Sequence, residues 1–428
     1  MDCDVIGRRD LLKQAAAGLA LVPFLPLLSA CGGTAAPSVA PPASSPAAAA
    51  KPSSAAAAAS PGTSAATAAS GKPAANGKQL LEELVAKAKQ EGSLSASVRQ
   101  GLGAIAPAIG AGFNKRFGLN LDVKLDDRVT EYELFAKTRA AVQAGAPPPV
   151  DALEGPDGSH LPMALGGLAQ RVDNWQALLA EINPVVASGQ LKAEQLSPDP
   201  LQGFSFIWSH VAYVGIYNPK LISKADLPKR RADLADAKYK GKVASSPWLL
   251  DPWAYGPLVY AKDELVKAAQ GLAKNAASVA LFPDSANRIL LGELAFAELN
   301  HGYYYQSKAK DQQAPIEIHY FEDFTPMGSV LNMIPKGSKH PAAATLFSLW
   351  MTTPEAEAIW STSGQFYLNV LLNTQDVSKQ VVKNLKDAGS TMFTWFDNPK
   401  TVELFRWQST DEGKAYLDSL SKALTQRG

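Results

Sequence analysis

The sequence has only two cysteines, and both of them, Cys3 and Cys31, lie close to its N-terminus. The rest of the chain therefore offers no disulfide, no cysteine metal cluster and no thiol nucleophile. An excess of charge of one sign is also missing, because 41 Lys and Arg residues are balanced by 40 Asp and Glu residues. A nearly neutral chain has no strong electrostatic attraction to nucleic acid, so we expect no nucleic acid among its partners.

Catalytic signatures are missing as well. The sequence contains no G-x-S-x-G, H-E-x-x-H or G-x-x-x-x-G-K-[ST] segment. Its five histidines include no pair at the i, i+4 spacing that would place two metal ligands on one helix face. We therefore expect a protein that is not an enzyme and that has no resident cofactor.

The N-terminal segment has the features of an export signal. Arg8 and Arg9 precede an apolar run, from Ala15 to Ala30, which Pro23 and Pro26 interrupt. A membrane-spanning helix needs about 20 apolar residues, so this run is too short and too broken for one. We predict that residues 1–30 form a signal peptide of the twin-arginine type, which directs export of folded proteins.

A lipidation motif and a low-complexity segment follow the signal. The sequence "LSAC", which ends at Cys31, resembles a bacterial lipobox, in which the cysteine is acylated; the alternative is a cysteine that merely lies near a cleavage site. From Thr34 to Gly77 almost every residue is Ala, Ser, Pro, Gly or Thr, a composition that cannot bury a core. We predict that residues 31–77 are a lipidated cysteine and a disordered tether, which hold an extracytoplasmic protein at the cell membrane.

The remaining residues, 78–428, are enough for two lobes rather than one core. Residues 78–91 show helical spacing and end at Gly92, and strand patterns at 93–98 and 119–125 enclose a glycine-rich stretch and a helix that ends near Gly118. This order predicts a βαβ unit with parallel strands.

The glycine-rich stretch itself has two interpretations. "GLGAIA", Gly101–Ala106, satisfies the dinucleotide fingerprint G-x-G-x-x-A, with Asp122 or Asp126 downstream for a ribose contact. It would make the chain an exported nucleotide-dependent oxidoreductase. The simpler interpretation is a glycine turn that exposes the N–H groups at the start of a helix to a cleft.

Two later blocks resemble a known family. "VGIYNPKLISKADLPKRRADLADAKYKGKVASSP" (Val214–Pro247) and "IPKGSKHPAAATLFSLWMTTPEAEAIW" (Ile334–Trp360) resemble segments of the solute-binding proteins of ABC importers, in particular the ferric-iron-binding branch. The resemblance implies an α/β, two-lobe (type II) periplasmic-binding-protein fold, with a ligand cleft between the lobes. It also implies an ABC permease as partner, and we expect the protein to be a monomer.

The β-rich run Phe204–Tyr217 and the segment Pro315–Phe324 are the expected crossing strands between the lobes. We therefore predict one lobe from residues 78–205 and 318–428, which includes the C-terminal helices, and a second lobe from residues 206–317. A lobe inserted between two crossings can close over a ligand by a hinge motion.

The resemblance also implies ligand-binding residues. In the iron-binding branch two adjacent tyrosines ligate iron, and they map onto Tyr303 and Tyr304 of "LNHGYYYQSK"; an ungapped count reaches Gly302 and Tyr303. Glu154 is the implied carboxylate. Arg99 and Gln100 occupy the place where the family often has a histidine or tyrosine ligand. Ferric iron is hard and binds phenolate oxygen, because its charge lowers the pKa of the phenol.

The loop Ser245–Pro257 departs from the small residues that grip an anion in the iron-binding branch. It is aromatic, and we predict that Ser246, Trp253 and Tyr255 contact the ligand, while Asp251 can pair with a cation. Aromatic walls suit a small organic solute. The sequence therefore leaves three interpretations open: ferric iron as the transported solute, a small organic molecule, or tyrosines that only pack.

Overall fold

The structure is a computed structural model, and it describes residues 76–428 except 100, 364–367, 396–397 and 427–428. The predicted signal peptide, the lipidation site Cys31 and the predicted tether lie outside the described residues. Among the helices that are described, none is both long enough and apolar enough to cross a membrane.

The predicted βαβ unit opens the folded part and is confirmed. Strand β1 (Ser93–Ser97) pairs in parallel with β2 (Asp122–Asp126), and helix α3 (Ala106–Phe117) connects them. The preceding helix α2 (Gly77–Glu91) ends at Gly92, whose φ of 74° suits a residue without a side chain. The glycine and strand signals of the sequence therefore place these four elements correctly.

A long strand, β11 (Phe324–Pro335), organises the first sheet. Its antiparallel neighbours are β3 (Leu153–Pro156), β4 (Ala169–Gln170) and β5 (Ser205–Ala212), and β12 (Thr391–Phe393) pairs with it in parallel. All twelve residues of β11 are buried, because strands and helices cover it on both sides. We call the part of the structure built on β11 the first lobe.

The second sheet contains both antiparallel and parallel pairs. Its strand order is β10-β6-β9-β7-β8, in which β10, β6 and β9 are antiparallel and β9, β7 and β8 are parallel. The strands are β10 (Glu317–His319), β6 (Val214–Tyr217), β9 (Phe296–Leu299), β7 (Val243–Ser245) and β8 (Ala276–Val279). We call the part of the structure built on this sheet the second lobe.

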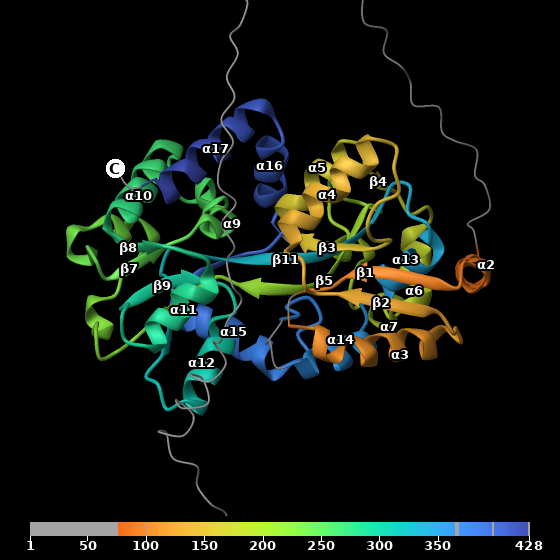
Figure 1. Cartoon of the computed structure of the whole chain (residues 1–428), viewed down its shortest axis with the longest axis horizontal. Coiled ribbons are helices and arrows are strands. Elements are labelled where there is room, and N and C mark those ends of the chain that lie inside the picture. Colours follow the sequence, from red (N-terminus) through yellow and green to blue (C-terminus); the bar gives the residue numbers. More distant parts are fainter. Residues whose placement is uncertain (1–75, 100, 364–367, 396–397, 427–428) are drawn as a thin grey trace, which may run out of the picture. The chain divides into compact units, whose positions relative to one another are not determined.

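The chain passes between the two sheets at the expected places. β5 belongs to the first sheet and β6 to the second, so the first crossing falls at Tyr213. β10 belongs to the second sheet and β11 to the first, so the chain returns between His319 and Phe324. Figure 1 shows β5 and β11 side by side across the middle of the folded part.

Helices surround both sheets. The first lobe carries α2, α3, α4 (Glu131–Gln143), α5 (Asp157–Leu165), α6 (Trp175–Ile182), α7 (Pro184–Ala187), α8 (Ala193–Leu196), α13 (Pro341–Trp350) and α14 (Pro354–Trp360). The second lobe carries α9 (Leu250–Trp253), α10 (Lys262–Asn275), α11 (Phe282–Leu290) and α12 (Gly302–Asp311). The last helices are α15 (Asp376–Asp387), α16 (Pro399–Gln408) and α17 (Asp411–Thr425).

Short 3-10 helices fill several of the connections. They are η1 (Gly103–Ile105), η2 (Lys224–Asp226), η3 (Arg231–Ala235), η4 (Ala237–Tyr239), η5 (Pro247–Leu249), η6 (Gly256–Leu258) and η7 (Ser361–Ser363).

Two elements lie across the lobe boundaries expected from the sequence, and the exact division of the chain into lobes stays a prediction. β5 pairs with β11 of the first sheet although it was placed with the second lobe. Helix α17 packs against α10, α9 and η5 of the second lobe although the C-terminal helices were placed with the first. β5 stays in the first sheet because the β-rich run passes to the second sheet only at Tyr213. Helix α17 lies with the second lobe because its apolar face packs on α10.

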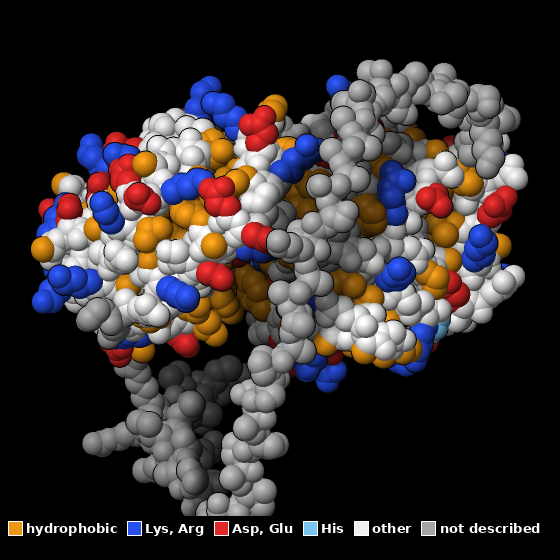
Figure 2. Space-filling view, turned by 90° about the horizontal axis from the view of Figure 1, so that it is seen from above, with side chains coloured by type: hydrophobic (Ala, Val, Ile, Leu, Met, Phe, Trp, Pro, Cys, Tyr) orange, Lys and Arg blue, Asp and Glu red, His pale blue; other side chains and the backbone are white. Residues whose placement is uncertain are grey.

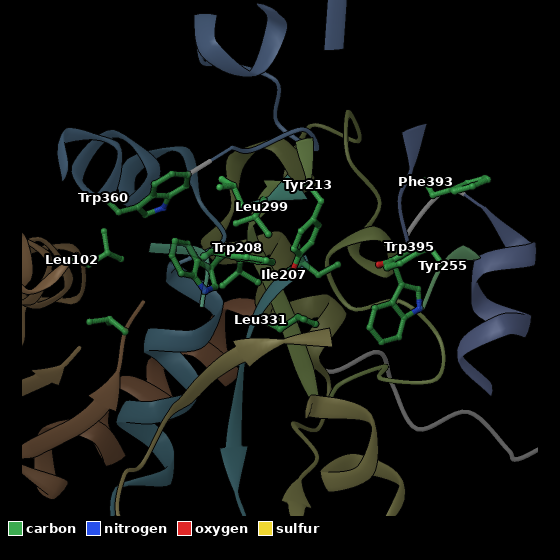
Figure 3. Packing of buried hydrophobic residues seen from close by; sticks show 14 of the residues in the cluster. Leu102, Ile207, Trp208, Tyr213, Tyr255, Leu299, Leu331, Trp360, Phe393 and Trp395 are labelled. Atoms are coloured by element: carbon green, nitrogen blue, oxygen red, sulfur yellow. The ribbon is translucent and has the colours of Figure 1, made fainter. Parts of the chain in front are cut away.

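The core runs continuously through both lobes. Trp208 of β5 and Trp360 of α14 are fully buried and pack edge to face, with ring centroids 5.3 Å apart (Figure 3). Such a pair adds about 0.5–1.5 kcal/mol beyond the area that it buries. On the outside, Figure 2 shows basic and acidic side chains intermixed over the visible face, which agrees with the small net charge.

Candidate ligand-binding cleft

A cleft lies between the first and second lobes, beside the two crossings. Its cavity volume is about 110 Å³. The first lobe contributes residues that follow β1 and begin α4, and the second contributes residues from η5, α9, α11 and the β9–α12 connection. The lining residues are Arg99, Glu131, Tyr132, Trp248, Asp251, Phe282, Pro283, Asn300, His301, Tyr304 and Tyr305.

Arg99, which follows β1, lines the cleft from the first lobe. Only 5% of its surface is exposed, and its Nη1 donates to Glu131 Oε1 at 3.1 Å and to Glu154 Oε1 at 3.3 Å. Burial raises the pKa of Glu154 to about 8, although Arg99 favours the ionised form. The guanidinium charge is therefore already shared between two carboxyl groups of its own lobe.

Asp251 is the acidic group of the second-lobe side. Its Oδ2 accepts hydrogen bonds from Tyr132 at 2.6 Å, across the cleft, and from Tyr213 at 3.2 Å, at the crossing. Burial raises the pKa of Asp251 to about 6, and the hydrogen bond from Tyr132 opposes this shift. The Tyr132 hydrogen bond joins α4 of one lobe to α9 of the other.

A second phenol–carboxylate bond crosses the lobes in the opposite direction. Tyr255, after α9, donates to Asp157 Oδ2 of α5 at 2.8 Å, and the same carboxylate accepts from the backbone of Gly158 at 2.8 Å. Burial raises the pKa of Asp157, and these hydrogen bonds limit the shift. Each lobe thus supplies one tyrosine and one aspartate to the contact between the lobes.

The three tyrosines of α12 do not all face the cleft. Tyr304 and Tyr305 line it, with their rings in an edge-to-face contact at 5.2 Å. Tyr303 instead packs beside Ile318 on the opposite side of the helix, where its hydroxyl bonds to Tyr320. Helix α12 begins at Gly302, which packs so closely on Val214 that a side chain added there would meet Val214 Cγ2 at 2.5 Å. The structure therefore brings Tyr304 to the cleft but not Tyr303.

The aromatic loop supplies a different set of residues from the one expected. Ser246, Trp253 and Tyr255 are buried, and none of the three lines the cleft. Ser246 caps η5 by accepting from the Trp248 N–H at 3.2 Å, and Trp253 Nε1 donates to Glu298 at 3.0 Å. Trp248 and Asp251 point to the cleft instead, because the loop folds into the short helices η5 and α9.

Two further expectations concern the first lobe. Glu154 lies behind Arg99, 2% exposed, and it does not line the cleft. Gln100 lies outside the described residues. Of the two described residues expected there, Arg99 is the one that the structure places in the cleft.

The N–H groups of the glycine loop are bonded within the protein. The Asp127 carboxylate accepts from the N–H groups of Gly101 at 3.2 Å and Gly103 at 2.9 Å. A side chain added at Gly103 would meet these carboxylate oxygens at 2.5 Å. The N–H groups that a dinucleotide would need are therefore already bonded to an acidic side chain of the same protein.

Several lining residues were not expected from the sequence. Tyr132 and Glu131 begin α4, and Phe282 and Pro283 begin α11, so both pairs lie where a helix follows a strand. Helix starts at the ends of strands are common ligand positions in α/β folds, and this signal is present in the sequence. Without the lobes in place, however, no pattern shows which helix starts meet across the cleft.

The fold and the cleft are those of a two-lobe binding protein. The chain belongs to the bacterial extracellular solute-binding protein family, whose match covers residues 108–389. The resemblance and the type II two-lobe fold expected from the sequence are confirmed.

Proteins that are similar to this chain in sequence or in fold bind different solutes. An Fe(3+)-binding periplasmic protein of Serratia marcescens is 28% identical over 213 residues, which are 46% of this chain and 63% of that protein. Iron-bound HitA from Pseudomonas aeruginosa has a TM-score of 0.57 at 19% identity, over 77% of this chain and 99% of that one. AfuA from Actinobacillus pleuropneumoniae, with fructose-6-phosphate bound, has a TM-score of 0.59 at 15% identity, over 78% and 98%. None of these names describes an enzyme, and at such identities the structural matches show the fold alone.

Proposed function

We propose that this protein is the substrate-binding component of an ABC importer. It captures a small solute, ferric iron or a small organic molecule, in the cleft between its lobes and delivers it to a permease. The observation that carries the proposal is the cleft itself, which both lobes line and which two phenol–carboxylate bonds close. Binding is coupled to closure because the ligand contacts both lobes only when they meet.

Ferric iron is supported by the tyrosines of α12 and by the names of several relatives. Tyr304 and Tyr305 are adjacent phenols at the cleft, and an iron ion would favour their ionised forms. Burial, with smaller contributions from Tyr304 and Asp284, raises the pKa of Tyr305 to about 12, so the phenol needs a bound cation in order to ionise near neutral pH. Among the described residues, no group of three or more His, Cys, Asp and Glu side chains is arranged to hold a metal.

A titration of the full-length protein with ferric citrate tests the iron version. We expect a saturable phenolate-to-iron absorption band if iron is the solute, and Tyr304→Phe should abolish it. Tyr303→Phe is the matched control on the same helix, because its hydroxyl faces Tyr320 and not the cleft. A folded protein that shows no band at saturating iron would exclude ferric iron as the solute.

We further propose that the mature protein is a monomer anchored to the cell membrane through an acylated Cys31, after export by the twin-arginine route. The support is the signal-like segment and the lipobox-like "LSAC". In cell fractionation, Cys31→Ala should move the protein from the membrane to the soluble extracytoplasmic fraction. Substitution of both Arg8 and Arg9 by Lys should leave the uncut precursor in the cell.

A further inference from the structure

The charges that line the cleft do not balance. Its charged lining residues are Arg99, Glu131 and Asp251, one basic and two acidic. Arg99 is paired with Glu131 and with Glu154 behind it. Asp251 forms no ion pair with any described residue, and both of its side-chain hydrogen bonds come from neutral phenols. Arg99 favours the ionised form of Asp251 from within the same cavity, but it forms no ion pair with that carboxylate. A half-buried carboxylate without an ion-pair partner offers a binding position for a positively charged ligand.

The surroundings of Asp251 are aromatic. Tyr132, Trp248, Phe282, Tyr304 and Tyr305 all line the same cavity. Trp248 and Phe282 are in edge-to-face contact at 5.5 Å, so part of the wall is a fixed aromatic corner. Faces of aromatic rings carry negative potential and attract organic cations, most strongly where water is excluded.

The other solute chemistries find fewer partners. An anion would need the guanidinium of Arg99 or the N–H groups of the glycine loop, and Glu131, Glu154 and Asp127 already bond to them. The cavity volume of about 110 Å³ also restricts the solute to a small molecule.

Resting on the proposed function, we infer that the solute is a small organic ammonium ion. Its charged nitrogen pairs with the Asp251 carboxylate, and the carbon atoms around the nitrogen lie against the rings of Trp248 and Tyr304. The Tyr132 hydroxyl already donates a hydrogen bond to Asp251 Oδ2. The bound ammonium group would therefore pair with a carboxylate that also accepts this hydrogen bond. Asp251 then determines specificity by the sign of its charge.

The test is calorimetric titration of the full-length protein with small probes of different charge. Butylammonium, tetramethylammonium and 1,4-diaminobutane represent the cations; 1-butanol, butyrate and ferric citrate represent a neutral molecule, an anion and iron. We expect at least one ammonium probe to bind saturably and at least about tenfold more tightly than 1-butanol and butyrate.

Variants separate charge from shape. Asp251→Asn keeps the shape and should weaken the ammonium probe at least about tenfold, whereas Asp376→Asn on the exposed start of α15 should leave its affinity unchanged. Trp248→Leu should reduce the preference for the ammonium probe over 1-butanol by about threefold or more, because it removes an aromatic face that attracts the cation. This second variant tests the inference independently if Asp251→Asn does not fold.

The outcomes distinguish the inference from the proposed function. If butyrate or ferric iron binds and no ammonium probe does, the ammonium inference is wrong and the solute-binding function stands. Unchanged ammonium affinity in Asp251→Asn also overturns the inference. If no probe of any charge binds to the folded protein, the ammonium inference is wrong.

Discussion

Asp251 combines two properties that point to a binding role: it lines a cavity, and the pKa of its carboxyl group is raised. Its pKa is raised to about 6, first by burial and also by the neighbouring Asp157 and Glu131, while Tyr132 and Arg99 oppose the shift. Tyr213 faces the same carboxylate from the crossing. Protonation of Asp251 therefore falls within the mildly acidic range.

The affinity for butylammonium should consequently depend on pH. Above a pH of about 6 Asp251 is ionised and pairs with the cation; below it the carboxyl is neutral, and the affinity should fall toward about tenfold per pH unit. Titrations at pH 5, 6 and 7.5 measure the effect. Asp251→Asn should bind weakly and equally at all three values, and an identical pH profile in that variant would assign the dependence to another group.

The buried phenol of Tyr255 makes a contact that a phenylalanine cannot make. Tyr255→Phe leaves one oxygen of buried Asp157 without its strongest donor, and we expect a loss of about 1–3 kcal/mol in the free energy of unfolding. Urea unfolding measures it. Tyr416→Phe is the control, because the Tyr416 hydroxyl is buried without a hydrogen-bond partner and its removal should cost about nothing. Equal losses in both variants would contradict the assigned role of the hydrogen bond.

At the scale of the element, the glycine loop shows how much of the site could be predicted. The sequence indicated the β1–α3–β2 unit and its tight turn, because glycine and strand patterns are local. It could not show that Asp127, just beyond β2, folds back onto the turn. The same limit explains the tyrosines: the resemblance pointed to Tyr303 and Tyr304, but only the packing of α12 shows that Tyr304 lines the cleft while Tyr303 packs beside Ile318.

The aromatic loop illustrates a related limit. Trp248, Asp251, Trp253 and Tyr255 were all visible in the sequence as an unusual set for this position. Their directions follow from the turns of η5 and α9, and the hydrogen bonds of Trp253 and Tyr255 lead inward to Glu298 and Asp157. The composition of the loop indicated that the cleft is aromatic and acidic. The tertiary structure shows that Trp248 and Asp251 are the residues of this loop that line it.

Removal of the Asp127 carboxylate should loosen the turn that follows Arg99. We expect Asp127→Ala to reduce the free energy of unfolding by about 1–3 kcal/mol, because two N–H groups lose their acceptor. The neighbouring Asp126→Ala is the matched control; Asp126 pairs only with exposed Arg128, and its loss should cost less than about 1 kcal/mol. Chemical denaturation measures the free energy of unfolding of both variants. A larger loss in Asp126→Ala than in Asp127→Ala would show that Asp127 does not stabilise the turn.

On the scale of the whole molecule, the two lobes are joined by more than a pair of crossing strands. After β12, in the first sheet, the chain continues into α16 and α17, which pack on the second lobe. On the way, Trp395 Nε1 donates to the Asp199 carbonyl at 3.0 Å, and Gln408 donates to the Ala254 carbonyl at 2.6 Å. Neither lobe can therefore unfold without loss of contacts in the other.

We expect a single calorimetric unfolding transition for the folded part. Leu420→Ala, in the buried face of α17, should shift this whole transition to lower temperature, with a cost of about 2–5 kcal/mol. Leu291→Ala, at a side chain that is 73% exposed, should leave the transition in place. Two transitions, of which Leu420→Ala moves only one, would show that the lobes unfold independently.

The paired phenols and carboxylates also link the motion of the lobes to acidity. While the lobes meet, Asp251 and Asp157 hold their protons more tightly than ordinary aspartates do, because Asp157 is buried and Asp251 is half-buried and desolvated. When α4 parts from α9, water reaches these carboxyl groups and their pKa returns toward about 3.9. Opening of the lobes then releases protons, and closing takes them up. A lower external pH would therefore stabilise the closed state, and it would at the same time lower the affinity for a cation, because the Asp251 carboxylate becomes neutral.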